Sequence, residues 1–306
     1  MKAFSGLYEK GYVSILNSVG YPNPNRSHFR SMDIWQSASG SKEYIRSGWL
    51  GRYLDANCTK SHESLEIEST LSLALKGEKK NGLAVKNSDT FYRALQDQYF
   101  QDLLEGEKSD SENRNLNYLY KTLAETNESA KYLFEKHTVK KNTTEFPKTK
   151  IGRDLDVVSQ FIQSGLNTKV YYVSHNGFDT HVNQKQLHNR LLEQYSDAVS
   201  AFVKSLEKSG QLDDILILTF SEFGRRTEQN ASGGTDHGKA NNLFLIGNNF
   251  KNQGVYNENP DLSDLDEGDL TYTIDFRSVY QEILNKHLGA DSEKILKNKF
   301  PVLNIL

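Results

Sequence analysis

Five side chains that commonly bind metals fall in two loops, each of which follows an apolar run. They are Asp179, His181, Glu222, Asp236 and His237. The apolar runs lie at residues 170–174 and 215–220. Imidazole and carboxylate together suit zinc, manganese or iron. Because ligands bind beyond the carboxyl ends of the strands in an open parallel sheet, we expect a metal site at that edge.

Each of these short motifs also has an ordinary structural explanation. Asp179-x-His181 alone is typical of a capped loop, and Asp236-His237-Gly238 is typical of a turn. The four glycines of the second loop allow its backbone to turn tightly around an ion or an anion. The placement of both motifs at neighbouring strand ends favours a shared site over two unrelated turns.

A third polar cluster, residues 20–35, contains a candidate nucleophile. It follows the strand expected at residues 12–19, and its prolines and asparagines predict a rigid loop. Ser27 is expected to begin a short helix, whose field stabilises developing negative charge, and a metal would activate its hydroxyl. Arg26 and Arg30 are candidates for binding a phosphate or sulfate oxyanion. The ordinary alternatives are a helix-capping serine and solvated arginines.

Helices and strands that would position these clusters alternate from residue 151 onward. Apolar spacing predicts helices at residues 151–164, 185–209 and 275–288, and apolar runs predict strands at residues 168–174, 213–220 and 241–247. The run at residues 213–220 is the kind that is buried on both faces of a parallel sheet. This order predicts an α/β fold with a mostly parallel sheet and helices on both faces.

The first half of the chain lacks this regular alternation of helices and strands. Phe4, Leu7 and Tyr8 predict an amphipathic helix that runs into the first strand. Residues 61–148 are more charged, and we interpret them as a mostly helical insertion or cap within one domain that spans residues 1–306.

Composition excludes several classes of protein. The chain has 306 residues with 37 Lys and Arg against 40 Asp and Glu, so the charge balance indicates neither a nucleic acid nor an anionic membrane as partner. Cys58 is the single cysteine, which excludes an internal disulfide and a CxxC metal site. No apolar run is long enough to span a membrane, and the first residues do not form a signal peptide.

Five motifs in a fixed order resemble a known family. They read GYPNPNRSHFRSMDIW, GWLGRYLD, VYYVSHNGFDTHVNQ, LTFSEFGRRTEQNASGGTDHG and DFRSVYQEIL. They resemble the bacterial domain-of-unknown-function family fifteen-oh-one, which is grouped with the alkaline phosphatase and sulfatase superfamily. The resemblance covers nearly the whole chain and is weakest over residues 61–148.

The resemblance implies an alkaline phosphatase-like fold and a metal-dependent hydrolase of small or polymer-borne phosphate or sulfate esters. Ser27 resembles the superfamily's nucleophile, Asp179 and His181 one ligand pair, and His237 the late histidine ligand. Glu222 stands where relatives often have an Asp-His pair. The implied cofactor is a divalent metal, either zinc, manganese or calcium.

Two departures from the family pattern matter for function. Phe223 stands where the superfamily commonly has a histidine, which implies a weakened metal subsite. An export signal and a first strand that relatives usually carry are also not seen, so the chain resembles an N-terminally truncated member. This predicts a gap or an exposed apolar groove beside one of the strands, and poor solubility.

The sequence therefore leaves two functions open. One is a metal-dependent ester hydrolase, and the other is a non-catalytic exported or surface binding protein that keeps the fold with a degenerate metal site. Family resemblance implies a periplasmic or extracellular location, whereas the chain as written would stay in the cytoplasm. The sequence does not determine the oligomeric state.

Overall fold

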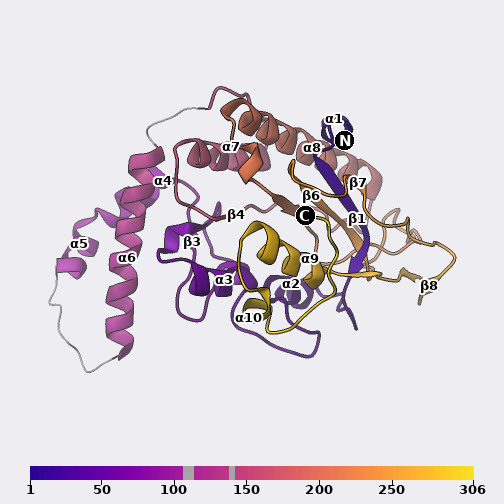
Figure 1. Ribbon diagram of the computed structural model, residues 1–306, viewed down its shortest axis with the longest axis horizontal. Coiled ribbons are helices and arrows are strands. Elements are labelled where there is room, and N and C mark those ends of the chain that lie inside the picture. The colour runs from indigo at the N-terminus through magenta and orange to yellow at the C-terminus, as the bar shows by residue number, and fades with distance from the viewer. Residues whose placement is uncertain (106–113, 138–141) are drawn as a thin grey trace.

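Strand β1 (Val13–Gly20) forms the centre of the main sheet in the computed structural model, which describes residues 1–105, 114–137 and 142–306 (Figure 1). Its neighbours are β6 (Asn241–Ile246), which runs antiparallel, and β10 (Ile274–Asp275) and β7 (Gly254–Val255), which run parallel. Strand β5 (Ile217–Thr219) pairs antiparallel with the other edge of β6, which gives the order β10-β1-β6-β5.

A smaller sheet consists of three parallel strands in the order β3-β2-β4. Their bounds are β2 Ser64–Glu66, β3 Leu83–Ala84 and β4 Val170–Tyr172. The expectation of a mostly parallel sheet is therefore correct for this sheet and wrong for the main one, which is mixed. The reason is that β5 and β6 pair directly with each other in antiparallel register. They are joined by residues 220–240, which we call the glycine-rich loop.

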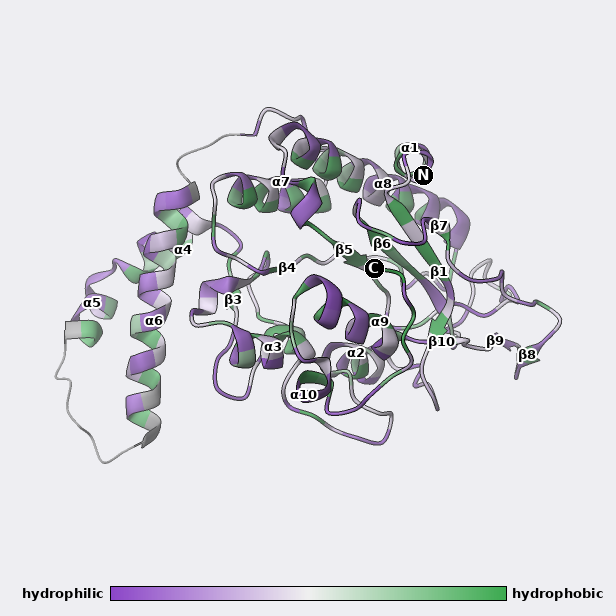
Figure 2. Cartoon of the chain, viewed as in Figure 1, coloured by the Kyte–Doolittle hydropathy of each residue, from purple (hydrophilic) through white to green (hydrophobic). Residues whose placement is uncertain are grey.

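Helices cover both faces of the main sheet, as the sequence predicts. One face carries α1 (Lys2–Glu9), α7 (Lys150–Gln163) and α8 (Gln184–Ser209). The other face carries α2 (His28–Ser37), α3 (Trp49–Asn57), α9 (Phe276–Glu282) and α10 (Ser292–Leu296). Apolar residues gather on the central strands and on the inner sides of α7 and α8 (Figure 2).

Strand β6 shows how the two layers of the core arise. Its side chains alternate between faces, as the period of a strand requires. Leu243 and Leu245 pack with α2 and α9, whereas Phe244 and Ile246 pack with α1 and α8. The expected first helix follows the same logic, because Phe4 and Leu7 are buried against α8 while Tyr8 remains exposed.

Strand β5 differs from the fully buried run that the sequence predicts, and β4 is partly exposed as well. Among the described strands, β4 pairs only with β2 and β5 pairs only with β6. Every residue from 215 to 220 is partly exposed, although five of the six are apolar. The expectation that residues 213–220 lie inside a sheet is therefore corrected, because β5 lies at one end of the strand order.

The segment at residues 61–148 contributes both to a sheet and to a helical projection. Strands β2 and β3 pair in the small sheet, and the short helices η1 (Ser61–Glu63) and η2 (Leu73–Leu75) adjoin them. Helices α4 (Ser88–Leu95), α5 (Gln98–Glu105) and α6 (Arg114–His137) extend away from the sheets at one end of the molecule (Figure 1). Stacking of Tyr92 on Phe134 joins α4 to α6.

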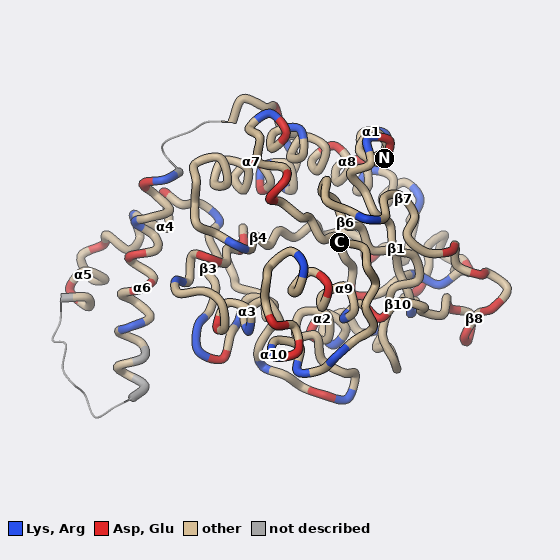
Figure 3. Tube along the Cα trace, viewed as in Figure 1, with Lys and Arg blue, Asp and Glu red and all other residues tan. Residues whose placement is uncertain are grey.

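The remaining elements are short. They are η3 (Leu212–Asp214), the hairpin β8 (Leu265–Asp266) and β9 (Asp269–Leu270), and the π-helical turn η4 (Ile283–His287). Lysine and arginine are mixed with acidic residues along the described trace (Figure 3), and the formal net charge of the chain is -3. No helix in the described ranges is both long and apolar enough to cross a membrane.

Candidate metal centre

Three imidazole rings surround the carboxylate of Asp179. The Nε2 atoms of His181 and His237 each lie 2.9 Å from Asp179 Oδ1, and they lie 3.0 Å from each other. His28 Nε2 lies 3.2 Å from Asp179 Oδ2. Two ligands of one tetrahedral zinc ion, each about 2 Å from it, lie roughly 3.3 Å apart. Asp179, His181 and His237 thus have nearly the spacing that one ion requires, and the Nε2 atom of His28 lies next to Asp179.

The other nitrogen of each ring faces an oxygen acceptor. His28 Nδ1 lies 2.7 Å from a carboxylate oxygen of Glu222, and His181 Nδ1 lies 3.2 Å from a carboxylate oxygen of Asp236. His237 Nδ1 lies 2.8 Å from the backbone carbonyl oxygen of Arg26. In the tautomer that donates Nδ1–H to these oxygens, each neutral ring has its lone pair on Nε2, facing Asp179.

Loops from three strand ends bring these side chains together. His28 begins α2, shortly after β1, while Asp179 and His181 lie in the loop between β4 and α8. His237 lies in the loop between β5 and β6, where it forms an isolated antiparallel bridge with Arg225. The sequence prediction that the loops after β4 and β5 meet is therefore confirmed, even though the strands belong to different sheets.

Glycine is required where the two loops touch. A Cβ atom on Gly234 would lie 2.2 Å from the backbone carbonyl of His181, and one on Gly224 would lie 1.8 Å from the backbone oxygen of Ala240. Contacts this short do not occur, so any larger residue must push the backbones apart. Gly234 therefore permits the close approach of the two loops, and Gly224 permits a close approach of the backbone to itself within the loop between β5 and β6.

Gly234→Ala is expected to destabilise the protein by about 1–3 kcal/mol, as overpacking of a tight contact does. Gly6→Ala is the matched control, since Gly6 lies inside α1 with nothing within 4 Å of its added Cβ. That change should stabilise the protein by roughly 0.5–1 kcal/mol. Urea unfolding measures both, and equal stability of Gly234→Ala and wild type would contradict the close approach.

Arg225 joins the two loops and holds Asp179 ionised. Its guanidinium donates to the backbone oxygens of Phe178 and Thr235, at 2.7 Å and 2.8 Å, and to Asp179 Oδ1 at 3.1 Å. Partial burial raises the pKa of Asp179, but hydrogen bonds from His237 and Arg225 outweigh it and hold that pKa well below its usual range. Asp179 is therefore a carboxylate at neutral pH.

The ring of Phe223 packs against two of the imidazole rings. Its buried ring lies 4.2 Å from the ring of His237 at an angle of 27°, and 4.9 Å from the ring of His28. A rigid apolar neighbour restricts both rings to one orientation and excludes water from that side. Phe223 thus packs directly against two of the clustered histidines.

Of the five sequence-predicted metal residues, Asp179, His181 and His237 face one another. Glu222 and Asp236 contact the outer nitrogens of His28 and His181 instead. Hydrogen bonds from Asn230 and then from His181 lower the pKa of Asp236, so it also accepts as a carboxylate. All five predicted residues therefore belong to one cluster. Three of them form its centre, and the other two contact the outer nitrogens of the histidine rings.

The three remaining sequence-predicted residues, Arg26, Ser27 and Arg30, lie just before α2 or in its first turn. Ser27 is the N-cap of α2, is exposed, and makes no side-chain capping hydrogen bond. The Arg26 side chain pairs with the buried carboxylate of Asp269. Arg30 donates to backbone oxygens at residues 40, 41 and 43, and it stacks 3.9 Å from the ring of Tyr44. Both arginine side chains are thus engaged by the protein itself.

Sequence reasoning missed His28 and Arg225. Both lie in the quoted motifs, and His28 directly follows Ser27 at a strand end. The rule that selected His181 and His237, a histidine in a polar loop after an apolar strand, also fits His28. Arg225 gave no such signal, because arginines in loops are usually solvated.

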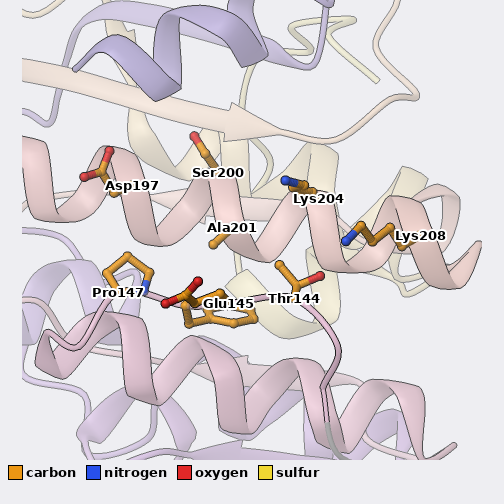
Figure 4. A pocket seen from close by; sticks show the side chains of 9 residues that line it. Thr144, Glu145, Pro147, Asp197, Ser200, Ala201, Lys204 and Lys208 are labelled. Carbon is orange, nitrogen blue, oxygen red and sulfur yellow. The ribbon is translucent and has the colours of Figure 1, made fainter.

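A separate open pocket of about 490 Å³ lies between α8 and the segment at residues 144–147 (Figure 4). Its charged lining residues are Glu145, Asp197, Lys204 and Lys208. It contains no histidine and none of the clustered residues described above. The concentration of catalytic residue types therefore lies at the strand ends and not in this pocket.

The fold and the cluster define a mixed α/β protein with a histidine and carboxylate centre built on strand-end loops. The model of the family described as protein of unknown function DUF1501 matches residues 12–299, so the chain belongs to that family. Neither the comparison with curated proteins nor that with solved structures found a match.

Proposed function

We propose that this protein binds a divalent metal ion at Asp179, His181 and His237 and hydrolyses a phosphate or sulfate ester. One observation carries the proposal: the Nε2 atoms of two histidines lie 3.0 Å apart and 2.9 Å from the same carboxylate oxygen. When both rings carry their proton on Nδ1, the lone pairs of the two Nε2 atoms at this distance repel each other and the carboxylate. A cation held between the three groups turns each of these repulsions into an attraction.

Charge and exposure fit such an ion. The ionised Asp179 supplies a negative charge, and Glu222 and Asp236 add negative charge to the outer side of the rings. The side chain of Asp179 is 50% exposed, whereas that of His237 is 16% exposed. The cluster is therefore closed on the protein side and open to substrate on the solvent side.

In the proposed reaction the bound metal would supply Lewis-acid polarisation of the ester. The Ser27 hydroxyl would attack the phosphorus or sulfur and lose its proton to solvent, the ester oxygen would leave as the alcohol, and water would then cleave the seryl ester. This hydroxyl makes no capping bond and lies at the positive end of α2. His237 and His181 are held in position by the Arg26 carbonyl and by Asp236. In this proposal Arg26 and Arg30 serve to position the loop, because their side chains already have protein partners.

Ser27→Ala tests the chemistry. We expect kcat for p-nitrophenyl phosphate or p-nitrocatechol sulfate to fall roughly 10³-fold or more, as loss of a nucleophile does. Bound metal, measured by elemental analysis, should stay at the wild-type level. Ser232→Ala is the control, because Ser232 is an exposed serine in the glycine-rich loop. Equal rates for Ser27→Ala and wild type would remove Ser27 from the mechanism.

The second candidate function is a non-catalytic metal-binding protein. It is favoured by the packing of Phe223 against His237 and His28, which puts an apolar ring on that side of the two histidines. Stoichiometric metal without turnover of either ester would support this alternative. Turnover that disappears in Ser27→Ala would exclude it.

A further inference from the structure

We infer that His28 is an additional ligand of the proposed metal and that Glu222 is the residue that orients it. This inference rests on the proposed function, which assigns the metal to Asp179, His181 and His237. It adds a fourth group from a third loop, so that the ion would join α2 to the loops after β4 and β5.

The position of the His28 ring carries the inference. Its Nε2 is buried and makes no hydrogen bond, although Asp179 Oδ2 lies only 3.2 Å away. Candidate ligand atoms of His28, Asp179 and His237 all lie within 4.8 Å of one another. A buried nitrogen that faces a carboxylate oxygen without a hydrogen bond is costly unless a proton or a metal cation lies between them.

Glu222 decides which nitrogen of His28 faces the cluster. Its Oε1 lies 2.7 Å from His28 Nδ1, while its Oε2 accepts a hydrogen bond of 3.1 Å from the Ser221 hydroxyl. The backbone oxygen of Glu222 also accepts from Ser31 of α2. The carboxylate is therefore fixed relative to α2, and it holds Nδ1–H so that Nε2 is free to bind metal.

The competing explanation is an imidazolium. His28 carrying a proton on both nitrogens would form ion pairs with Glu222 and Asp179 at the same distances. The two explanations differ in what happens on metal addition. If His28 is a metal ligand, the ¹⁵N signal of its Nε2 shifts when the metal binds. If His28 is an imidazolium held by two carboxylates, its Nε2 does not become metal-bound and that signal stays in place.

Histidine side-chain ¹⁵N spectra of the full chain during zinc titration distinguish them. The chain has 8 histidines. We expect three to acquire a metal-bound Nε2 with Nδ1 still protonated, and His28→Gln should remove one of these three signals. His175→Gln is the control, because His175 bonds the backbone oxygen of Leu191 outside the cluster. It should remove an unshifted signal.

Each result decides one claim. If zinc shifts no histidine, the proposed metal function is wrong. If zinc shifts two histidines in wild type, or His28→Gln leaves every shifted signal in place, the metal site stands and His28 is not a ligand. The count in wild type decides the question even where a variant does not fold.

Glu222 is tested by metal affinity. Glu222→Ala should weaken zinc binding by about 10- to 100-fold in chelator competition, as loss of an outer partner of a ligand histidine does. Glu222→Gln should recover most of that loss, because its amide oxygen still accepts from Nδ1. Wild-type affinity in Glu222→Ala, or equal loss in both variants, would overturn the orienting role.

Discussion

Asp179→Asn is expected to abolish stoichiometric metal binding, and with it any ester hydrolysis. Asp179 is contacted by three imidazoles and by Arg225, so it is the one group shared by all parts of the cluster. The amide keeps the shape but removes the negative charge that offsets the ion and the guanidinium. We expect zinc affinity to fall by more than the roughly 100-fold that loss of an outer partner produces.

Asp236→Asn provides the graded control for this prediction. Its amide oxygen can still accept from His181 Nδ1, so zinc affinity should fall by less than about 10-fold. Isothermal titration with zinc measures both variants, and elemental analysis after gel filtration confirms the stoichiometry. Similar affinities for Asp179→Asn and wild type would show that the ion, if bound, lies elsewhere.

Trp35→Ala is expected to have the largest effect on stability, about 3–5 kcal/mol, as truncation of a buried tryptophan does. Trp35 is 2% exposed and lies stacked 5.2 Å from the ring of Phe220 and 4.2 Å from that of Phe276. It thereby joins α2 to the end of β5 and to the start of α9. The loss should appear as a lower urea midpoint with an unchanged slope.

Phe29→Ala is the matched control, because Phe29 lies on the same helix and is 88% exposed. Its effect should lie within about 0.5 kcal/mol of zero. Trp35→Phe should keep part of the stacking and recover part of the loss. Equal destabilisation by Trp35→Ala and Phe29→Ala would show that the stacked rings do not anchor α2.

Local patterns in the sequence determined the helices and the polar loops. The apolar stripe of α8 and the stop at Gly210, whose φ is +69°, follow from side chains a few residues apart. The same holds for α9, which Asp275 caps through the backbone N–H of Arg277. Family membership was also determined by sequence, since the long motifs stand in a fixed order.

Only the tertiary structure decided the order and direction of the strands and the position of each residue within the cluster. Strand order and direction depend on pairings between distant residues, such as Val19 with Ile274, for which no local pattern exists. The sequence predicted that Glu222 and Asp236 lie near His181 and His237. It could not distinguish a residue that faces Asp179 from one that contacts the outer nitrogen of a histidine ring. That distinction depends on which imidazole nitrogen each carboxylate reaches, and the packing of three separate loops sets it.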